Sequence, residues 1–305
     1  CLNRQDVTLA LTGVSKSFNE FAAVTDLSLQ ARRGRIFGLL GPNGAGKTTT
    51  IRMIVGITAP DAGRVEFLGQ PMSPALRDRI GYLPEERGLY RKMKIGEQLR
   101  FFAELKGMSG QRAEREIDRW LERMKLTEWK LKKTDELSKG MQQKVQFIAA
   151  VLHDPDLLIL DEPFSGLDPM SVETLNRAVL DLQAAGKTII LSTHLMEQAE
   201  KLCADICLIN RAHRVLGGSL REIKQSYGRN TIALRVEGAN GVLADATLVA
   251  GSRQHSDYAE VLLADGADAQ ELLRRLVETG AHVSKFEQVE PSLNDIFIER
   301  VNATS

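Results

Sequence analysis

The segment GPNGAGKT, from Gly41 to Thr48, constrains the fold most, because it satisfies the pattern G-x-x-x-x-G-K-[ST]. An apolar run typical of a strand, residues 36–40, precedes it, and apolar residues at helical spacing follow it. Glycines let backbone N–H groups turn toward phosphate oxygens, and the helix adds its positive N-terminal dipole. We expect Lys47 to reach the β- and γ-phosphates of a nucleotide and Thr48 to hold Mg²⁺. The expected nucleotide contacts in this region are Gly41, Pro42, Asn43, Gly44, Ala45, Gly46, Lys47, Thr48 and Thr49.

The alternation of strand-like and helix-like segments predicts an α/β fold, a P-loop NTPase core followed by a small C-terminal α+β domain. Residues 7–29 are rich in short strands, and we expect an antiparallel β subdomain there beside a mostly parallel, helix-covered sheet. Residues of about 86–150 have apolar side chains at helical spacing, which predicts an inserted helical subdomain. The expected domains are therefore an ATPase domain, residues 1–228, and an accessory domain, residues 229–305.

The composition of the chain argues against two classes of function. Its 305 residues include 40 Lys plus Arg against 40 Asp plus Glu, so charge gives no support to nucleic-acid binding. No run of about 18 apolar residues occurs, and the opening CLNRQDVTLA lacks the apolar core of a signal peptide. We expect a chain that neither crosses a membrane nor enters secretion. Cys1, Cys203 and Cys207 form no CxxC pair and are expected to be reduced, cytosolic cysteines.

A second strand-like run, residues 157–160, ends in two adjacent carboxylates, Asp161 and Glu162. Alternating strand geometry sends these two side chains in different directions. In a chain with a phosphate-binding loop, Asp161 is expected to bind the Mg²⁺ shell and Glu162 to polarise the water that attacks the γ-phosphate. Without that loop, a strand that ends in acids would more often be a loop start or a helix cap.

The segment LSKGMQ, from Leu137 to Gln142, precedes that strand and resembles the LSGGQ motif of the ABC ATPase family. It opens a predicted helix, residues 141–152, so Ser138 and Gly140 are expected to present donors to an anion. A plain N-cap is the alternative role for Ser138, and the two roles are compatible. The resemblance implies that this motif completes the ATP site of a second copy in a head-to-tail homodimer, with ATP and Mg²⁺ as cofactors.

Three further residues match the same family in chain order. Asp168, in the segment SGLD, resembles the D-loop residue that communicates between the two sites. His194 follows a strand-like run and resembles the histidine that contacts the γ-phosphate. Phe18 resembles the aromatic residue that stacks on adenine, although Phe21 competes for that role. The resemblance thus implies three catalytic residues, Lys47, Glu162 and His194.

Glu85 departs from the family pattern, because glutamine is usual at its position. A carboxylate keeps an oxygen for Mg²⁺ and loses the amide donors, so the implied metal ligands are Thr48, Glu85 and Asp161. The substitution also adds negative charge near the γ-phosphate, and a solvated loop carboxylate is the alternative interpretation. Lys139 and Met141 replace the usual Gly and Gln of the LSGGQ motif and leave Ser138 and Gly140 intact.

The stretch YLPEERGLY, residues 82–90, is similar to that of the ATP-binding subunits of bacterial exporters related to sodium and drug efflux systems. That resemblance implies an ATPase that powers export through a separate transmembrane permease, on the cytoplasmic face of the cell membrane. Residues 87–102 would meet the permease. The C-terminal domain resembles the accessory extension of the same branch, and the transported substrate stays undefined.

Three other classes of P-loop protein fit the sequence less well. ABC ATPases that act on ribosomes usually carry two cassettes and those that act on DNA insert a long coiled coil, whereas this chain has one P-loop and no such insertion. A regulatory module that holds ATP without turnover would not need Lys47, Asp161, Glu162 and His194 together. A nucleotide kinase or a small GTPase would share only the P-loop.

Overall fold

The computed structural model describes residues 6–86, 88–227, 231–238, 241–264, 266–289 and 291–303 of the chain. The chain divides into two compact units, Cys1–Gly218 and Ser219–Ser305. This division lies earlier than residue 228, at which the sequence pattern changes. The assignment of functional domains from the sequence stays a prediction.

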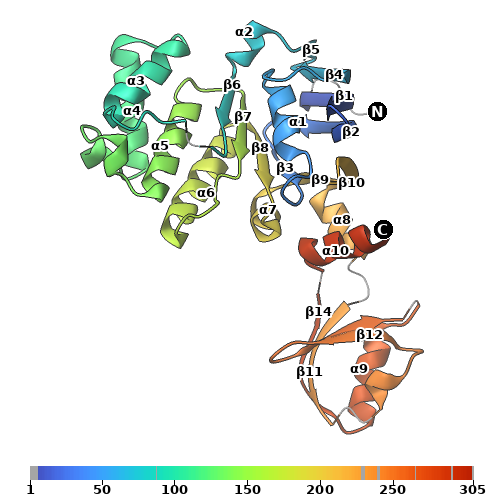
Figure 1. The fold of residues 1–305 in the computed structure, drawn as a ribbon. Helices are drawn as coiled ribbons and strands as arrows, with labels where there is room; N and C mark the ends of the chain where they lie inside the picture. The colour runs from blue at the N-terminus through green and yellow to red at the C-terminus, as the bar shows by residue number, and fades with distance from the viewer. Residues whose placement is uncertain are drawn as a thin grey trace. The chain divides into compact units, whose positions relative to one another are not determined.

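A six-stranded sheet forms the centre of the first unit, and its strand order is β10-β9-β3-β8-β7-β6 (Figure 1). All four pairings among β9, β3, β8, β7 and β6 are parallel. Every residue of β3 and β7 is buried, as is typical of parallel strands with both faces covered. The mostly parallel sheet expected from the sequence is confirmed. Its strands are β3 (Ile36–Leu40), β6 (Ile80–Leu83), β7 (Leu157–Asp161), β8 (Thr188–Thr193), β9 (Asp205–Asn210) and β10 (His213–Ser219).

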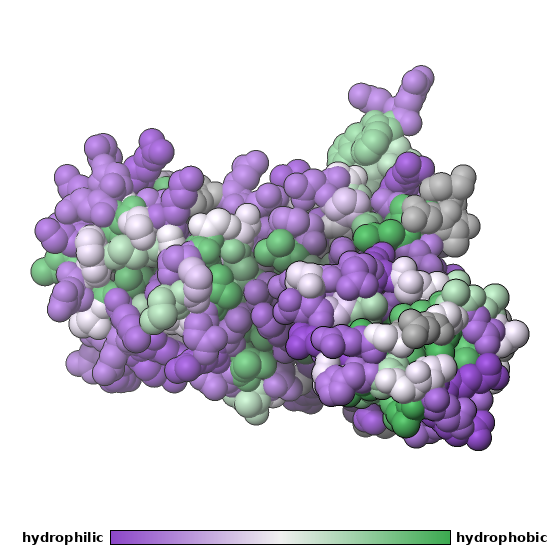
Figure 2. Space-filling view, turned by 90° about the horizontal axis from the view of Figure 1, so that it is seen from below, coloured by the Kyte–Doolittle hydropathy of each residue, from purple (hydrophilic) through white to green (hydrophobic). Residues whose placement is uncertain are grey.

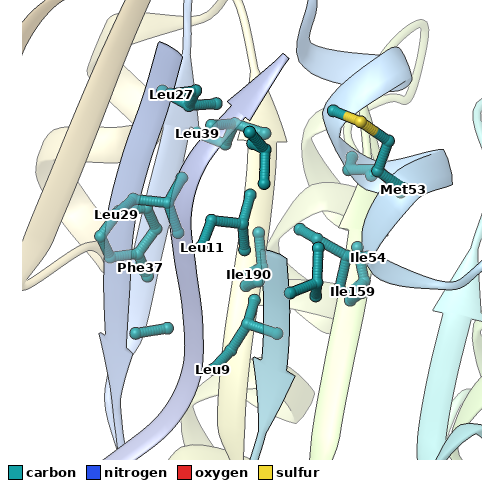
Figure 3. Close-up of a cluster of buried hydrophobic side chains, with 14 of the residues drawn as sticks. Leu9, Leu11, Leu27, Leu29, Phe37, Leu39, Met53, Ile54, Ile159 and Ile190 are labelled. Atoms are coloured by element: carbon teal, nitrogen blue, oxygen red, sulfur yellow. The ribbon is translucent and has the colours of Figure 1, made fainter. Parts of the chain in front are cut away.

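A second sheet in the same unit is antiparallel and has the order β2-β1-β4-β5. Its inward side chains and those of α1 (Lys47–Ile54) join one apolar cluster with the central sheet, as the close-up of Leu11, Phe37, Met53 and Ile190 illustrates (Figure 3). The expected antiparallel subdomain is therefore present, and it shares a buried apolar cluster with the helix that follows the glycine-rich loop. The strands are β1 (Val7–Phe18), β2 (Phe21–Arg32), β4 (Ala62–Phe67) and β5 (Gln70–Pro71).

The inserted helical subdomain consists of α3 (Ile95–Leu105), α4 (Gly110–Arg123) and α5 (Lys139–Val151), which contact one another. Trp120 and Phe147 meet edge to face in its interior, with ring centroids 5.9 Å apart. The remaining helices of the unit are α2 (Pro74–Arg77), α6 (Pro169–Ala184) and α7 (Met196–Leu202), with short 3₁₀ turns at Thr127–Trp129 and Thr134–Glu136. The helix expected at residues 141–152 begins earlier, at Lys139, because Ser138 is its N-cap.

The second unit has the small α+β fold that the sequence predicts. Its antiparallel sheet has the order β12-β13-β11-β14, and Leu272 and Leu276 of α9 share one buried apolar cluster with Ile232 and Leu234 of β11. Asp268 begins α9 by accepting a hydrogen bond from the backbone N–H of Gln270. The elements are α8 (Leu220–Tyr227), β11 (Thr231–Glu237), a 3₁₀ turn (Val242–Ala244), β12 (Val249–Gln254), β13 (Ala259–Leu263), α9 (Ala269–Glu278), β14 (His282–Gln288) and α10 (Leu293–Ala303).

Within the described part of the chain, no helix combines the length and the apolar character that spanning a bilayer requires. On the face drawn in Figure 2, hydrophilic residues predominate and apolar residues form small separate groups.

Candidate nucleotide site

The loop between β3 and α1 has a backbone that only glycine fits at two positions. A Cβ at Gly41, where φ is 149°, would lie 2.1 Å from the carbonyl oxygen of Ile209, and one at Gly46, where φ is 113°, would lie 2.4 Å from that of Ala23. Gly44, by contrast, faces open space. The helix that follows has no side-chain cap, so its first backbone N–H groups are available to an anion. The loop therefore has the geometry of a phosphate cradle.

Lys47 is buried at the base of this loop, with an exposed fraction of 6%. Its Nζ donates to the carbonyl oxygens of Gly41 at 2.7 Å and Pro42 at 3.2 Å. The same atom lies 3.5 Å from Oε1 of Glu162. The ammonium group is thus held beside the cradle, where its charge would compensate that of bound phosphate.

Asp161 and Thr48 meet where β7 ends and α1 begins. The Thr48 hydroxyl donates to Oδ2 of Asp161 at 3.2 Å, while Oδ1 is buried and no described residue offers it a hydrogen bond of suitable geometry. Burial raises the pKa of the Asp161 carboxyl, because the charged form has lost its hydration. A hydroxyl beside a buried carboxylate with one unpartnered oxygen fits the oxygen ligands that Mg²⁺ prefers.

Glu162 is fixed by the end of strand β8. Its backbone lies in the left-handed region, with φ of 48°, and its N–H donates to the carbonyl oxygen of Ser192 at 2.9 Å. Its carboxylate accepts hydrogen bonds from the Thr193 hydroxyl at 3.2 Å and from the backbone N–H of His194 at 3.0 Å. The Nδ1 atom of His194 lies 2.9 Å from Oε1 of Glu162. The two adjacent carboxylates thus have different partners. Asp161 contacts Thr48, and Glu162 contacts Thr193 and His194.

A cavity of about 410 Å³ opens in front of these residues. It brings together the cradle, Lys47, Thr48, Glu85 and Glu162. Its complete lining is Phe21, Ala23, Asn43, Gly44, Gly46, Lys47, Thr48, Thr49, Glu85 and Glu162.

The aromatic side chain of this cavity is Phe21. Phe18 pairs with Phe21 across the turn between β1 and β2, is exposed, and does not line the cavity. Its ring instead lies 5.6 Å from Nζ of Lys16. The structure therefore places the competing aromatic residue, rather than Phe18, next to the phosphate loop.

Ser138, Gly140 and Asp168 form a separate cluster that does not line the cavity. Ser138 accepts a hydrogen bond from the N–H of Met141 at 3.3 Å, and Asp168 accepts from both the N–H and the hydroxyl of Ser171. These bonds with Ser171 lower the pKa of Asp168. A Cβ at Gly140 would lie 3.0 Å from Oγ of Ser171, so the starts of α5 and α6 lie against each other.

Two contributors were missed or underrated in the sequence. Thr193, which donates to Glu162, gave a signal only through its place in the triplet Ser-Thr-His. Tyr82, on β6, interacts electrostatically with the site. Burial, and then the charge of Asp161, raise the pKa of its phenol to about 12.

A second, mostly apolar cavity of about 280 Å³ lies between the central sheet and the helical subdomain. Its lining includes Leu89, Phe102 and Leu105, with Lys106 and His153 as its basic members. The family resemblance implies permease contacts for residues 87–102, and Arg87 of that range lies outside the described residues. Gly88, Leu89 and Phe102 of that range line this apolar cavity.

Two family profiles match this chain. The first, described as ABC transporter, matches residues 24–165. The second, described as the C-terminal domain of ATP-binding protein DrrA1-3-like, matches residues 218–301. The first match lies within the first structural unit, and the second spans most of the second unit.

Individual relatives agree with the profiles. The chain is 45% identical to the uncharacterized ABC transporter ATP-binding protein YhaQ of Bacillus subtilis, over 97% of this chain and 99% of that protein. It is 37% identical to Nod factor export ATP-binding protein I of Cupriavidus pinatubonensis, over 80% of this chain and 78% of that protein. A solved structure of the ATP binding subunit of an ABC transporter superposes with a TM-score of 0.68 and 32% identity, over 72% of this chain and 93% of that one.

Proposed function

Because this chain belongs to the ABC transporter ATP-binding proteins and is an ATPase of that type, we propose that it powers an exporter whose transport path is a separate membrane-spanning polypeptide. The observation that carries the proposal is the position of Glu162, which is held by Thr193 and His194 at the edge of a cavity that also contains the phosphate loop. A general base must lie within reach of the water that it activates, and this carboxylate lines the cavity 3.5 Å from Nζ of Lys47, the group expected to bind the γ-phosphate.

The described side chains support the following division of work at that cavity. Backbone N–H groups of the loop and Lys47 bind the phosphates, Phe21 packs on the adenine, and Thr48, Asp161 and Glu85 hold Mg²⁺. When bound, Mg²⁺ neutralises charge on the phosphate oxygens. Glu162 then accepts a proton from the attacking water, and His194 orients the carboxylate and contacts the γ-phosphate.

A second copy of the chain completes the site in this proposal. Ser138, Gly140 and Asp168 lie apart from the cavity lining within one chain, so a phosphate bound by Ser138 and Gly140 would belong to a nucleotide held by another copy. A head-to-tail dimer supplies it, because each copy then presents this cluster to the nucleotide of the other. Association follows nucleotide binding, and two copies carry two sites.

The membrane partner docks at the apolar cavity beside α3, with the chain on the cytoplasmic face of the membrane. Leu89, Phe102 and Leu105 offer the apolar surface that a partner helix needs. The direction of transport is proposed from the relative whose name states Nod factor export.

The deciding experiment measures MgATP hydrolysis by the wild-type chain and by Glu162→Gln, each alone and with the membrane protein encoded beside it. We expect partner-stimulated turnover in the wild type, its loss in Glu162→Gln, and accumulation of an ATP-bound dimer in that variant. A wild-type chain that binds MgATP and never hydrolyses it with the partner would refute the motor role.

A further inference from the structure

The phosphate end of the cavity holds more negative than positive charge. Among the described residues that line it, Lys47 is the single Lys or Arg, and Glu85 and Glu162 are both present. Asp161 adds a third carboxylate, joined to the lining through the hydroxyl of Thr48. One cation therefore faces three carboxylates, and that cation is already 3.5 Å from one of them.

The third carboxylate, that of Asp161, is the most deeply buried of the three. Asp161 is fully buried and its Oδ1 has no hydrogen-bond donor of suitable geometry among the described residues. Burial raises the pKa of Asp161, the hydroxyls of Ser192 and Thr48 offset part of that rise, and the charges of Glu85 and Glu162 add to it. Glu85, although exposed, thus acts on the same site electrostatically.

The described side chains alone do not form a complete set of metal ligands. Within the described part of the chain, no group of three or more Asp, Glu, His or Cys side chains is arranged to hold a metal ion. Phosphate oxygens of a nucleotide would have to complete the ligand set. Metal and nucleotide are consequently coupled, and each raises the affinity for the other by the same factor.

We propose that Glu85 makes nucleotide binding conditional on the divalent metal, because its carboxylate repels metal-free ATP and attracts the metal-loaded nucleotide. This inference rests on the proposed function, since it concerns the same ATP site. An amide at this position would remove one negative charge from the cavity and keep an oxygen ligand. The wild-type chain therefore discriminates against free ATP more strongly than a glutamine variant does.

The test is equilibrium titration with a fluorescent ATP analogue, once in EDTA and once in saturating Mg²⁺, for the wild type, Glu85→Gln and Glu86→Gln. The dissociation constant in EDTA divided by the dissociation constant in Mg²⁺ measures the coupling between metal and nucleotide. Glu86 is the matched control, because it is adjacent, exposed and absent from the cavity lining. Glu85→Gln is expected to lower the ratio about fivefold, mainly through tighter binding in EDTA, and Glu86→Gln to leave it within about twofold.

Equal ratios for the wild type and Glu85→Gln would overturn the inference while leaving the ATP site in place. A wild type that binds no analogue even in Mg²⁺ would instead refute the proposed function. Should Glu85→Gln not fold, Glu85→Ala is to show the same tighter binding in EDTA. Raising the salt concentration should shrink the difference between wild type and variant, because exposed charges are screened.

Discussion

The Nδ1 atom of His194 lies 2.9 Å from Oε1 of Glu162, although the two residues belong to the ends of different strands. The ionised carboxylate accepts, so the imidazole carries its proton on Nδ1 in this bond. The backbone N–H of His194 donates to the same oxygen. Residue 194 therefore contacts the Glu162 carboxylate twice, once with its side chain and once with its main chain.

His194→Ala should reduce partner-stimulated hydrolysis at least about 100-fold and leave MgATP affinity within a few-fold, because the backbone donor persists while the side-chain donor is lost. Single-turnover hydrolysis and analogue titration measure the two effects separately. The control is His213→Ala, which removes an exposed histidine of β10 and should change neither quantity. Full activity of His194→Ala would contradict a catalytic role for the histidine.

Gly46→Ala should destabilise the fold by about 2–4 kcal/mol, because it combines a left-handed φ with a Cβ placed against the carbonyl of Ala23. Gly44→Ala is the matched control, since its φ is also positive and the space around it is open. We expect it to cost about 1 kcal/mol. Urea unfolding in the absence of nucleotide provides both values, and equal losses would show that the close approach at Gly46 is not limiting.

Phe21→Ala should weaken ATP binding about tenfold, as expected for loss of one aromatic ring stacked on a base. Phe18→Ala should weaken it less than about twofold, because Phe18 does not line the cavity. Both rings are exposed, so neither variant should unfold the chain. Titration with ATP and with inorganic triphosphate, which has no base to stack, isolates the contribution of base stacking to affinity. A larger loss of ATP affinity in Phe18→Ala than in Phe21→Ala would assign the adenine contact to Phe18.

Asp161→Asn should stabilise the nucleotide-free chain at neutral pH while abolishing metal-dependent hydrolysis. Burial raises the pKa of Asp161 above its unfolded value, so the folded state disfavours the carboxylate. The wild type loses stability as the pH rises from the ordinary aspartate pKa of about 3.9 toward the raised pKa of Asp161. The difference in unfolding free energy between Asp161→Asn and the wild type should therefore vanish as the pH falls toward about 3.9. Denaturant titrations across pH test this, with the exposed Asp78→Asn as a control that should stay within about 0.5 kcal/mol.

Local patterns predicted the central sheet and the need for glycine in the loop between β3 and α1, because each is specified by neighbouring residues. The loop needs glycine at Gly41 and Gly46 for its backbone to pass Ile209 and Ala23, and that requirement appears directly as a motif. Strands β3 and β7 are continuous apolar runs because they are buried on both faces. Both features follow from short segments of sequence.

Which aromatic side chain lines the cavity was harder to predict, because this depends on strand register. β1 and β2 pair with several register shifts, and the turn between them decides which aromatic side chain reaches the phosphate loop. A shift of one residue sends a side chain to the other face, and no local pattern records it. Thr193 was missed for a similar reason, since its bond to Glu162 exists only because β7 and β8 are neighbours.

The close contact at Gly140 also bears on the proposed dimer. A Cβ at Gly140 would lie 3.0 Å from Oγ of Ser171 and 3.3 Å from Oδ2 of Asp168, so the start of α5 is packed tightly against the start of α6. Asp168 stands a few residues after Glu162 on the same loop. In the proposed head-to-tail dimer, a copy whose Glu162 loop is displaced would present a shifted Asp168 to its neighbour, so pairing would favour chains whose Glu162 loop is correctly folded.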